Sequence, residues 1–497
     1  MKILARCVCL LVALWLCGCY PEERIWWSPK GDRAIVAVND HLHLVKADGR
    51  LGEPLLGGAS IEDWLVKTLA WLPDGTGFVC SRKRHVRTWE ETKKLISSQE
   101  SERIEAWLPM VLPTLEFEIA RIKDPGPVNG LQALMPGHDK SVFLSGLWVL
   151  YERQRADVEK VLRKLPQGEK IMAELDDARG IFSVFELCVV KLDQPTETSP
   201  QGIAWGLLEL PLMPKISPKH DAVAFLQFNE DNEAPDLRVN SLDGKTSLLV
   251  AQQISSGGFQ WMPEGRTLVF TKSLGQPKDS LQSIQQITVL QESGALMKPS
   301  HESRPEGARI KVEAPDRLPE ARLLALALMP ERAALHPLPD GRILFASQPI
   351  TLPVVESRPK LEPLLHLIAA DGRSLSTIPT TPGDLPTDLN YMVVSPDGKL
   401  VAVVEAATDA VAVVEVSSGK TVIISAPHPG WSCETVPAWK SATELTFAAL
   451  DEKTHAPCWM LWSAENGKHS LSSQWPAAAT FDWLSERKPE PTKGTNP

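Results

Sequence analysis

The chain has 497 residues, of which 43% are hydrophobic and 23% charged, and its 62 acidic side chains outnumber 52 basic ones to give a formal net charge of −10. This acidic balance leaves no excess of Lys or Arg to displace phosphate counterions, so it argues against nucleic acid as a partner. The length suggests two or three ordinary domains, unless internal repeats build one larger unit.

The N-terminal residues are typical of an export signal. Lys2 and Arg6 accompany an apolar run at 7–16. At about ten residues, this run is shorter than the roughly 20 that a membrane-spanning helix needs. The run ends in Leu16-Cys17-Gly18-Cys19, which resembles the bacterial lipobox. In that motif the last cysteine becomes the first residue of the mature protein and carries a lipid.

The resemblance implies that residues 1–18 are a cleaved signal peptide and that residues 19–24 link a lipid on Cys19 to the folded chain. Two acyl chains on such a cysteine are enough for stable anchoring to a membrane. Tyr20 rather than Asp follows the cysteine, which by the sorting habit of these lipoproteins implies the outer membrane, facing the periplasm. An ordinary secretory signal with incidental cysteines is the alternative.

One pattern recurs through the rest of the chain. An apolar stretch, often ending in Trp, is followed by a turn with Pro or Gly and then by a second apolar stretch. Proline fixes φ in such a turn, glycine accepts a positive φ, and the flanking Val-, Ile- and Phe-rich runs suit buried strands. Eight copies have their turns at 27–31, 71–75, 135–137, 217–221, 261–265, 338–341, 395–398 and 439–441.

Each copy is predicted to form four antiparallel strands. A second turn, such as Asn240–Gly244, follows the first in many copies and leaves room for a third and a fourth strand. Pro29 and Pro73, in successive copies, are 44 residues apart. Four short strands in a unit of this size are typical of a β-propeller blade.

We therefore predict an all-β fold, an eight-bladed β-propeller over residues 25–485. Seven blades are the alternative, because the strand-like segment Phe481–Ser485 and the segment that begins at Ile25 could each complete the first blade. An open blade would leave an unpaired edge, so closure of the ring is required. Residues 486–497 are polar and Pro-rich and are predicted to be a disordered tail.

Three long intervals between turns are expected to hold insertions, at about residues 85–113, 152–180 and 274–333. The first two have helical character and are placed in blades two and three, after the second strand of each. They should therefore rise on the same face of the ring. Loops positioned by a rigid scaffold commonly carry binding sites, although inserts can also pack on the ring and only enlarge it.

The turn Trp27–Gly31, followed by a β-branched strand and later by an Asp-Gly turn, resembles the WD-like propeller repeat of TolB and its relatives. The resemblance implies a rigid, non-catalytic platform in the periplasm that makes protein contacts. The chain departs from TolB in lacking room for a preceding α/β domain and in its predicted lipid anchor. The partners of TolB are therefore not carried over.

Four cysteines follow Cys19 in the sequence. Cys433 and Cys458 are close together in the last predicted blade, and an oxidising compartment would permit a disulfide between them. Cys80 and Cys188 lie in apolar, strand-like runs and are predicted to be buried thiols that act as small hydrophobic residues.

The sequence contains no nucleophile elbow, zinc-protease motif, P-loop or dinucleotide fingerprint, so no catalytic residue, metal or cofactor is predicted. The repeated tryptophans Trp27, Trp71, Trp261 and Trp439 are expected to wedge between blades. The favoured function is a non-catalytic lipoprotein of the cell envelope whose propeller binds a protein or an envelope polymer. The alternative is a carbohydrate-active enzyme, a lyase or a glycoside hydrolase, with a site at the central channel.

Overall fold

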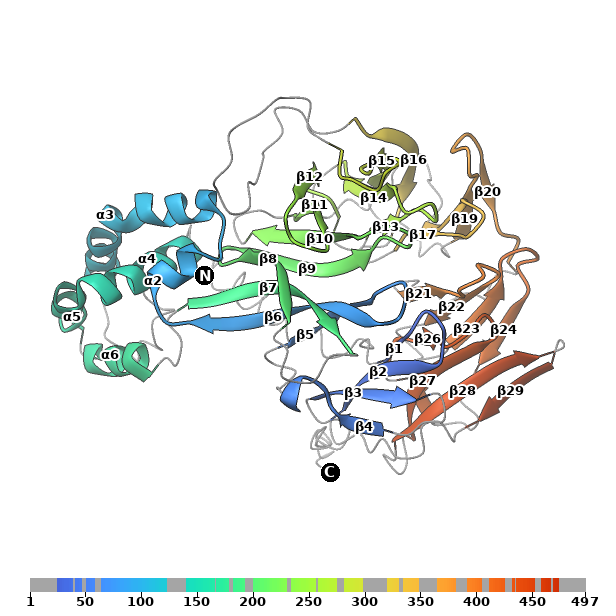
Figure 1. The fold of residues 1–497 in the computed structure, drawn as a ribbon, viewed down its shortest axis with the longest axis horizontal. Helices are drawn as coiled ribbons and strands as arrows, with labels where there is room; N and C mark the ends of the chain where they lie inside the picture. Colours follow the sequence, from blue (N-terminus) through green and yellow to red (C-terminus); the bar gives the residue numbers. More distant parts are fainter. Residues whose placement is uncertain are drawn as a thin grey trace, which may run out of the picture.

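The computed structural model is a ring of seven antiparallel sheets, a seven-bladed β-propeller with a helical insert on one side (Figure 1). We number the sheets as blades 1 to 7 in chain order. The structure describes residues 25–38, 41–46, 51–58, 64–122, 140–165, 167–177, 182–192, 200–229, 234–255, 258–274, 281–297, 320–329, 334–347, 364–380, 391–404, 411–424, 431–433, 435–451, 457–465 and 468–472.

Blades 1 to 4 each contain four strands that pair in sequence order. Blade 1 has β1 (Ile25–Trp27), β2 (Arg33–Val38), β3 (His41–Lys46) and β4 (Leu51–Pro54), followed by the short helix η2 (Leu55–Gly58); blade 2 has β5 (Trp64–Trp71), β6 (Gly77–Val86), β7 (Phe182–Lys191) and β8 (Gln201–Gly206); blade 3 has β9 (Glu209–Ile216), β10 (Ala222–Asn229), β11 (Asp236–Ser241) and β12 (Ser247–Ala251); blade 4 has β13 (Phe259–Trp261), β14 (Thr267–Ser273), β15 (Leu281–Thr288) and β16 (Arg322–Leu328).

Blades 5 to 7 complete the ring, and the innermost position of blade 7 is shared by two short strands that both pair with β27. Blade 5 has β17 (His336–Pro337), β18 (Ile343–Ser347), β19 (Leu364–Ile368) and β20 (Leu375–Thr377); blade 6 has β21 (Tyr391–Val394), β22 (Leu400–Val404), β23 (Val411–Glu415) and β24 (Thr421–Ile424); blade 7 has β25 (Trp431–Cys433), β26 (Ala438–Trp439), β27 (Glu444–Asp451), β28 (Pro457–Glu465) and β29 (Lys468–Ser472).

The prediction of eight blades is wrong, and the alternative of seven is confirmed. The expected copy with its turn at 135–137 explains the difference, because its second apolar stretch lies inside a helix, α4 (Lys140–Arg153). Val142, Phe143 and Leu147 of this helix are all buried. A short apolar run that is buried on nearly every side has the same sequence signal in a helix as in a core strand, so periodicity alone cannot separate the two.

The Pro-Gly turns between the first and second strands agree with the sequence pattern. Their glycines have positive φ, as Gly31, Gly75, Gly265, Gly341 and Gly398 show. Gly31 has the strictest requirement, since a Cβ atom on it would lie 2.2 Å from the carbonyl oxygen of Lys440 in blade 7. Only a residue without a side chain accommodates both this φ and this contact between blades.

The repeated tryptophans pack between blades, as the sequence predicts. Three of them lie on a first strand and donate an indole hydrogen bond to a backbone carbonyl of the preceding blade: Trp71 to Trp26, Trp261 to Lys215 and Trp439 to Val393, at 2.7–2.9 Å. Burying an indole is favourable when its N–H finds an acceptor, so each tryptophan contributes apolar area and fixes the relative position of two blades.

The ring closes between blade 1 and blade 7. The indole of Trp27 donates to Oγ1 of Thr446 at 2.9 Å, across 419 residues of sequence. Ile25, Trp27 and Val36 of blade 1 form one apolar cluster with Ala448 and Trp459 of blade 7. The strands of blade 1 all come from one end of the described chain and those of blade 7 from the other, so closure depends on side-chain packing between two complete blades.

The helical insert lies within blade 2, between β6 and β7. It comprises α2 (Trp89–Lys93), α3 (Ser98–Arg121), α4, α5 (Arg155–Leu162) and α6 (Gly168–Asp177). Figure 1 shows these helices beyond the ends of β6 and β7, on one side of the ring. None of the described helices is long and apolar enough to cross a bilayer.

Two predictions about the inserts need correction, and one prediction about the closing strand is not tested. Helices occur in both ranges expected to be helical, 85–113 and 152–180, but they belong to blade 2 alone rather than to blades two and three. The expected insert at 274–333 contains β15 and β16, two regular strands of blade 4. The predicted closing strand at 481–485 lies outside the described residues.

Candidate functional site

The hairpin of β6 and β7 carries the insert out of the ring. Both strands have ten residues, and they pair continuously from Gly77–Lys191 to Val86–Phe182. The Gly77 end packs between blade 1 and blade 3, whereas Val86 and Phe182 at the other end pack against the helices. The hairpin is therefore anchored in the ring at one end and forms the seat of the insert at the other.

An ion pair between a partly buried arginine and a buried carboxylate lies where the hairpin leaves the ring. Nε of Arg82 is 2.6 Å from Oε2 of Glu186, which is its register partner on the opposite strand. The indole of Trp205 on β8 donates to the other oxygen of Glu186 at 3.1 Å. Because both oxygens of this buried carboxylate are satisfied, three strands are tied together at this level.

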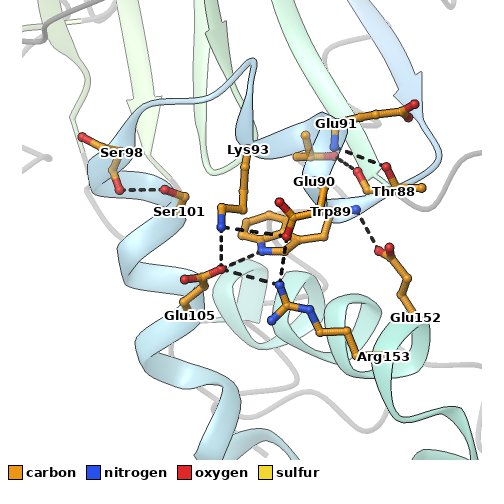
Figure 2. Close-up of polar contacts among 11 residues, drawn as sticks. Thr88, Trp89, Glu90, Glu91, Lys93, Ser98, Ser101, Glu105, Glu152 and Arg153 are labelled. Carbon is orange, nitrogen blue, oxygen red and sulfur yellow. Dashed lines mark hydrogen bonds and ion pairs between the residues drawn. The ribbon is translucent and has the colours of Figure 1, made fainter. Parts of the chain in front are cut away.

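Trp89 is the centre of the contact between the hairpin and the helices. Its side chain is fully buried, and its ring lies 5.5 Å from that of Phe182 on β7. Its backbone N–H donates to Glu152 on α4 at 2.7 Å, and its indole donates to Glu105 on α3 at 3.0 Å, as Figure 2 shows. One residue at the start of the insert therefore contacts the sheet and two helices.

Charged residues lie around the indole N–H of Trp89 (Figure 2). Oε1 of Glu105 accepts from Nζ of Lys93 at 3.1 Å and lies 3.7 Å from the guanidinium of Arg153, which also pairs with Glu90 at 3.3 Å. The hydrogen bonds from Trp89 and Lys93 lower the pKa of Glu105. The network joins α2, α3 and α4, but its members are partly exposed, so salt will screen it.

Glu100 connects the first turn of α3 to the loop between blades 2 and 3. Its side chain is 2% exposed, and its Oε1 accepts backbone N–H groups of Leu207, Leu208 and Glu209 at 3.0, 2.8 and 3.1 Å. Burial and the nearby charge of Glu209 raise the pKa of Glu100 to about 7, in spite of the three donors. This carboxyl group fixes α3 to the ring and titrates near neutral pH.

The stability of the insert is expected to depend on pH through Glu100. In the unfolded chain a glutamate titrates near 4.3, whereas folded Glu100 titrates near 7. Protonation therefore favours the folded state; its contribution is complete below about pH 4 and is lost as pH rises through 7. The raised pKa of Glu209 acts in the same direction.

In Glu100→Gln the neutral amide keeps an acceptor oxygen, so we expect the loss of insert stability between pH 5.5 and 8 to become smaller than in the wild type, by up to roughly 2 kcal/mol. Hydrogen exchange of α3 across this pH range measures the difference. Glu102→Gln, at an exposed position of the same helix, is the control. Identical pH profiles for wild type and Glu100→Gln would contradict the assignment.

The insert also has a hydrophobic core of its own. Thirteen buried side chains from α3 to α6 form it: Val111, Leu115, Phe143, Leu147, Leu150, Tyr151, Val158, Val161, Leu162, Leu165, Ile171, Met172 and Leu175. The hydroxyl of Tyr151 donates to Asp176 at 2.8 Å, which ties α4 to α6. Burial and this hydrogen bond raise the pKa of Tyr151 to about 12. The insert is therefore a folded unit seated on the ring, not a loose loop.

One face of α3 is apolar and exposed, and we call it the α3 stripe. It consists of Ala106, Pro109, Met110, Pro113, Phe117 and Ala120, all of them exposed and spaced along one side of the helix. Met110 is 56% exposed and Phe117 60%. Because proline has no N–H, Pro109 and Pro113 also deprive two carbonyls on this helix of their usual intrahelical donor. The α3 stripe thus combines apolar side chains with two proline positions that interrupt the intrahelical hydrogen bonding of α3.

In the described part of the chain, the innermost strands of the blades provide few groups suited to catalysis or metal binding. His336 on β17 has a buried Nε2 atom, and burial together with the charge of Lys215 on β9 lowers its pKa to about 4. A histidine with this pKa is neutral at pH 7 and is a poor proton donor there. Within the described ranges, no group of three or more His, Cys, Asp or Glu side chains is arranged to hold a metal.

No family model matches the chain, and no curated protein matches it. Solved structures do, at low similarity. The β-propeller domain of Cps50 (Swd1) from Myceliophteria thermophila is 10% identical with a TM-score of 0.44, and the match covers 90% of this chain and 97% of that one. A TolB from Agrobacterium tumefaciens is 13% identical with a TM-score of 0.31, covering 71% and 79%.

An oligogalacturonate lyase from Vibrio parahaemolyticus is also similar, at 11% identity and a TM-score of 0.38, covering 80% of this chain and 75% of the lyase. These three propellers belong to proteins of different kinds. At such identities the comparison concerns the fold alone, so neither the lyase nor TolB decides what this chain does.

The site residues predicted from sequence are Cys19 and the pair Cys433 and Cys458. Cys19 lies outside the described residues. Cys433 and Cys458 are both register partners of Ala449, one on each side of β27. Their Cα atoms are thus two strand spacings apart, roughly 9–10 Å, which exceeds the span of a disulfide. The thiol of Cys433 donates instead to the carbonyl of Thr435 at 3.2 Å, so the predicted disulfide is not the arrangement found.

Sequence reasoning missed the α3 stripe, Glu100 and the Trp89 contact. The alternation of Pro109 and Pro113 with apolar residues could have indicated an unusual helix face. By contrast, Glu100 accepts hydrogen bonds from residues more than 100 positions away, and no local pattern signals such a contact.

Proposed function

We propose that this chain is a non-catalytic lipoprotein of the cell envelope, whose propeller is a scaffold that presents the helical insert to a protein partner. The observation that carries the proposal is the α3 stripe, an exposed apolar surface on a helix that the ring holds in a fixed position. Isolated exposed apolar side chains are common, whereas a contiguous row on an ordered helix is typical of a binding surface.

The contacts beneath the α3 stripe support this role. Glu100 fixes the first turn of α3 to the ring, Trp89 fixes it to the sheet, and Val111 and Leu115 bury its opposite face. A partner that binds the exposed face would meet a preformed surface and would lose little free energy to ordering it. The expected partner presents an apolar segment to this face.

The binding proposal is tested with a double variant on the α3 stripe and with a control variant at an exposed apolar residue elsewhere. In Met110→Glu/Phe117→Glu the charges fall on the α3 stripe, whereas in Ile423→Glu the charge falls on β24, where Ile423 is 56% exposed. With the chain lacking residues 1–18 as bait in envelope extract, we expect a stoichiometric partner to be recovered by the wild type and Ile423→Glu. The double variant should lose at least tenfold in recovery. Equal recovery by all three would contradict the role of the stripe.

The lipid anchor is a separate part of the proposal, supported by the lipobox-like Leu16-Cys17-Gly18-Cys19. Cells expressing the chain and supplied with a labelled fatty acid are expected to transfer the label to Cys19. Cys19→Ser should abolish the labelling and release the protein from the membrane fraction. Equal labelling of Cys19→Ser and wild type would contradict lipidation at this position.

A further inference from the structure

Cys80 on β6 and Cys188 on β7 lie directly opposite each other in the hairpin that carries the insert. Opposite residues of an antiparallel pair have their Cα atoms about 4.5–5.5 Å apart. This separation falls inside the range that disulfides span. Sγ of Cys188 donates to the carbonyl oxygen of Cys80 at 3.6 Å, so its side chain is directed across to the neighbouring strand.

The position of the pair in the hairpin is specific. Cys80 is 2% exposed and Cys188 is fully buried, in the apolar cluster between blades 1 and 2. The next pair on the same face toward the helices is Arg82–Glu186, at the level where the hairpin leaves the ring. The two thiols therefore lie at the last apolar level of the ring below the insert.

We propose that Cys80 and Cys188 form a disulfide when the chain folds in the presence of a disulfide oxidant, and that this bond clamps the hairpin beneath the insert. The bond would join residues 108 positions apart. It would thus close a loop that contains helices α2 to α6. A cross-link over so long a loop restricts the unfolded chain strongly. The inference is independent of the proposed binding function.

The chemistry is ordinary thiol–disulfide exchange. The thiolate of one cysteine attacks a sulfur of oxidised glutathione, which forms a mixed disulfide and releases one glutathione thiolate. The thiolate of the second cysteine then attacks the protein-bound sulfur and releases the second glutathione. Two protein thiols are oxidised and one glutathione disulfide is reduced, and the two protons that leave the cysteines are taken up by the two glutathione thiolates to give thiols.

The burial of the pair determines when this exchange can occur. Burial raises the pKa of Cys80 well above the usual value, so little of the reactive thiolate forms in the folded protein. The oxidant also cannot reach a fully buried sulfur between two packed blades. The exchange is therefore expected during folding, before blade 1 covers the pair, and not in the folded reduced protein.

The test compares refolding of the reduced, unfolded chain with oxidised and with reduced glutathione. Each sample is denatured in an alkylating reagent, digested and examined by mass spectrometry. We expect a cross-linked peptide pair that contains Cys80 and Cys188 in the oxidised sample alone, and its disappearance on reduction. Alkylation of both cysteines after oxidative refolding, or cross-links of either one mainly to Cys433 or Cys458, would overturn the proposal.

A second measurement applies to protein purified in its folded form. After digestion within the insert, oxidised protein is expected to run as one species on a denaturing gel without reductant and as two with it. Cys80→Ala should give two fragments in both gels. Separation of the oxidised wild-type fragments without reductant would also overturn the proposal.

Discussion

Trp89→Ala is expected to release the helical insert from the ring and to destabilise its contact with blade 2 by about 3–5 kcal/mol. The side chain is among the largest that are fully buried, and its ring packs against Phe182. Its removal leaves a cavity at the junction and also leaves Glu105 without the indole donor at 3.0 Å. Both effects fall on the apolar cluster that joins the insert to the sheet.

Limited proteolysis measures this result. In Trp89→Ala we expect cleavage in α2 and α3 at least tenfold faster than in the wild type, while the blades remain resistant. Trp107→Ala is a useful comparison, because Trp107 is only partly buried in the same contact. Faster cleavage of the insert than of the ring would support the prediction. Equal acceleration of cleavage in both would contradict it, because Trp89 would then stabilise the whole molecule.

Trp27→Ala is expected to open the ring between blade 1 and blade 7, at a cost of about 3–5 kcal/mol. The substitution removes the hydrogen bond to Thr446 and most of the apolar contact with Ala448 and Trp459. The ammonium of Lys440, 5.9 Å from the centre of the Trp27 ring, would lose this contact as well. Hydrogen exchange is expected to increase first in blades 1 and 7.

Trp439→Ala provides the matched control, because Trp439 makes the equivalent bond to Val393 between blades 6 and 7, which are consecutive in the chain. Loss of that contact leaves the two blades covalently adjacent, so faster exchange should stay local. A double-mutant cycle of Trp27→Ala and Thr446→Val measures the interaction free energy of these two side chains. Equal exchange in blade 1 for Trp27→Ala and Trp439→Ala would contradict a special role in closure.

Much of the ring could be predicted from sequence because its strongest signals are local. The turns at Gly31, Gly75, Gly265, Gly341 and Gly398 need a positive φ within a few residues of a proline or an acidic residue, and the structure has it at each of them. The blade number failed where the signal was ambiguous. At Val142-Phe143-Leu144, an apolar run follows a Pro-Gly pair as it does in a blade, yet it belongs to a helix.

The candidate site was less predictable because it depends on contacts between distant segments. The sequence indicates helices near residues 85–113 and 152–180, but it cannot show that both are inserted in one hairpin, since β6 and β7 are almost 100 residues apart. The burial of Glu100 follows from the packing of α3 against the loop between blades 2 and 3. Likewise, Cys80 and Cys188 become neighbours only through the register of their strands.

The arrangement of blades 1 and 7 has a consequence for engineering. Every blade is built from one continuous stretch of chain, so each boundary between blades is topologically equivalent. A circular permutant that joins the segment after Ser472 to Ile25 and begins at β5 would keep all seven sheets and move the seam to the boundary of blades 1 and 2. There the bond from Trp71 to Trp26 would take over the task of holding the two ends together.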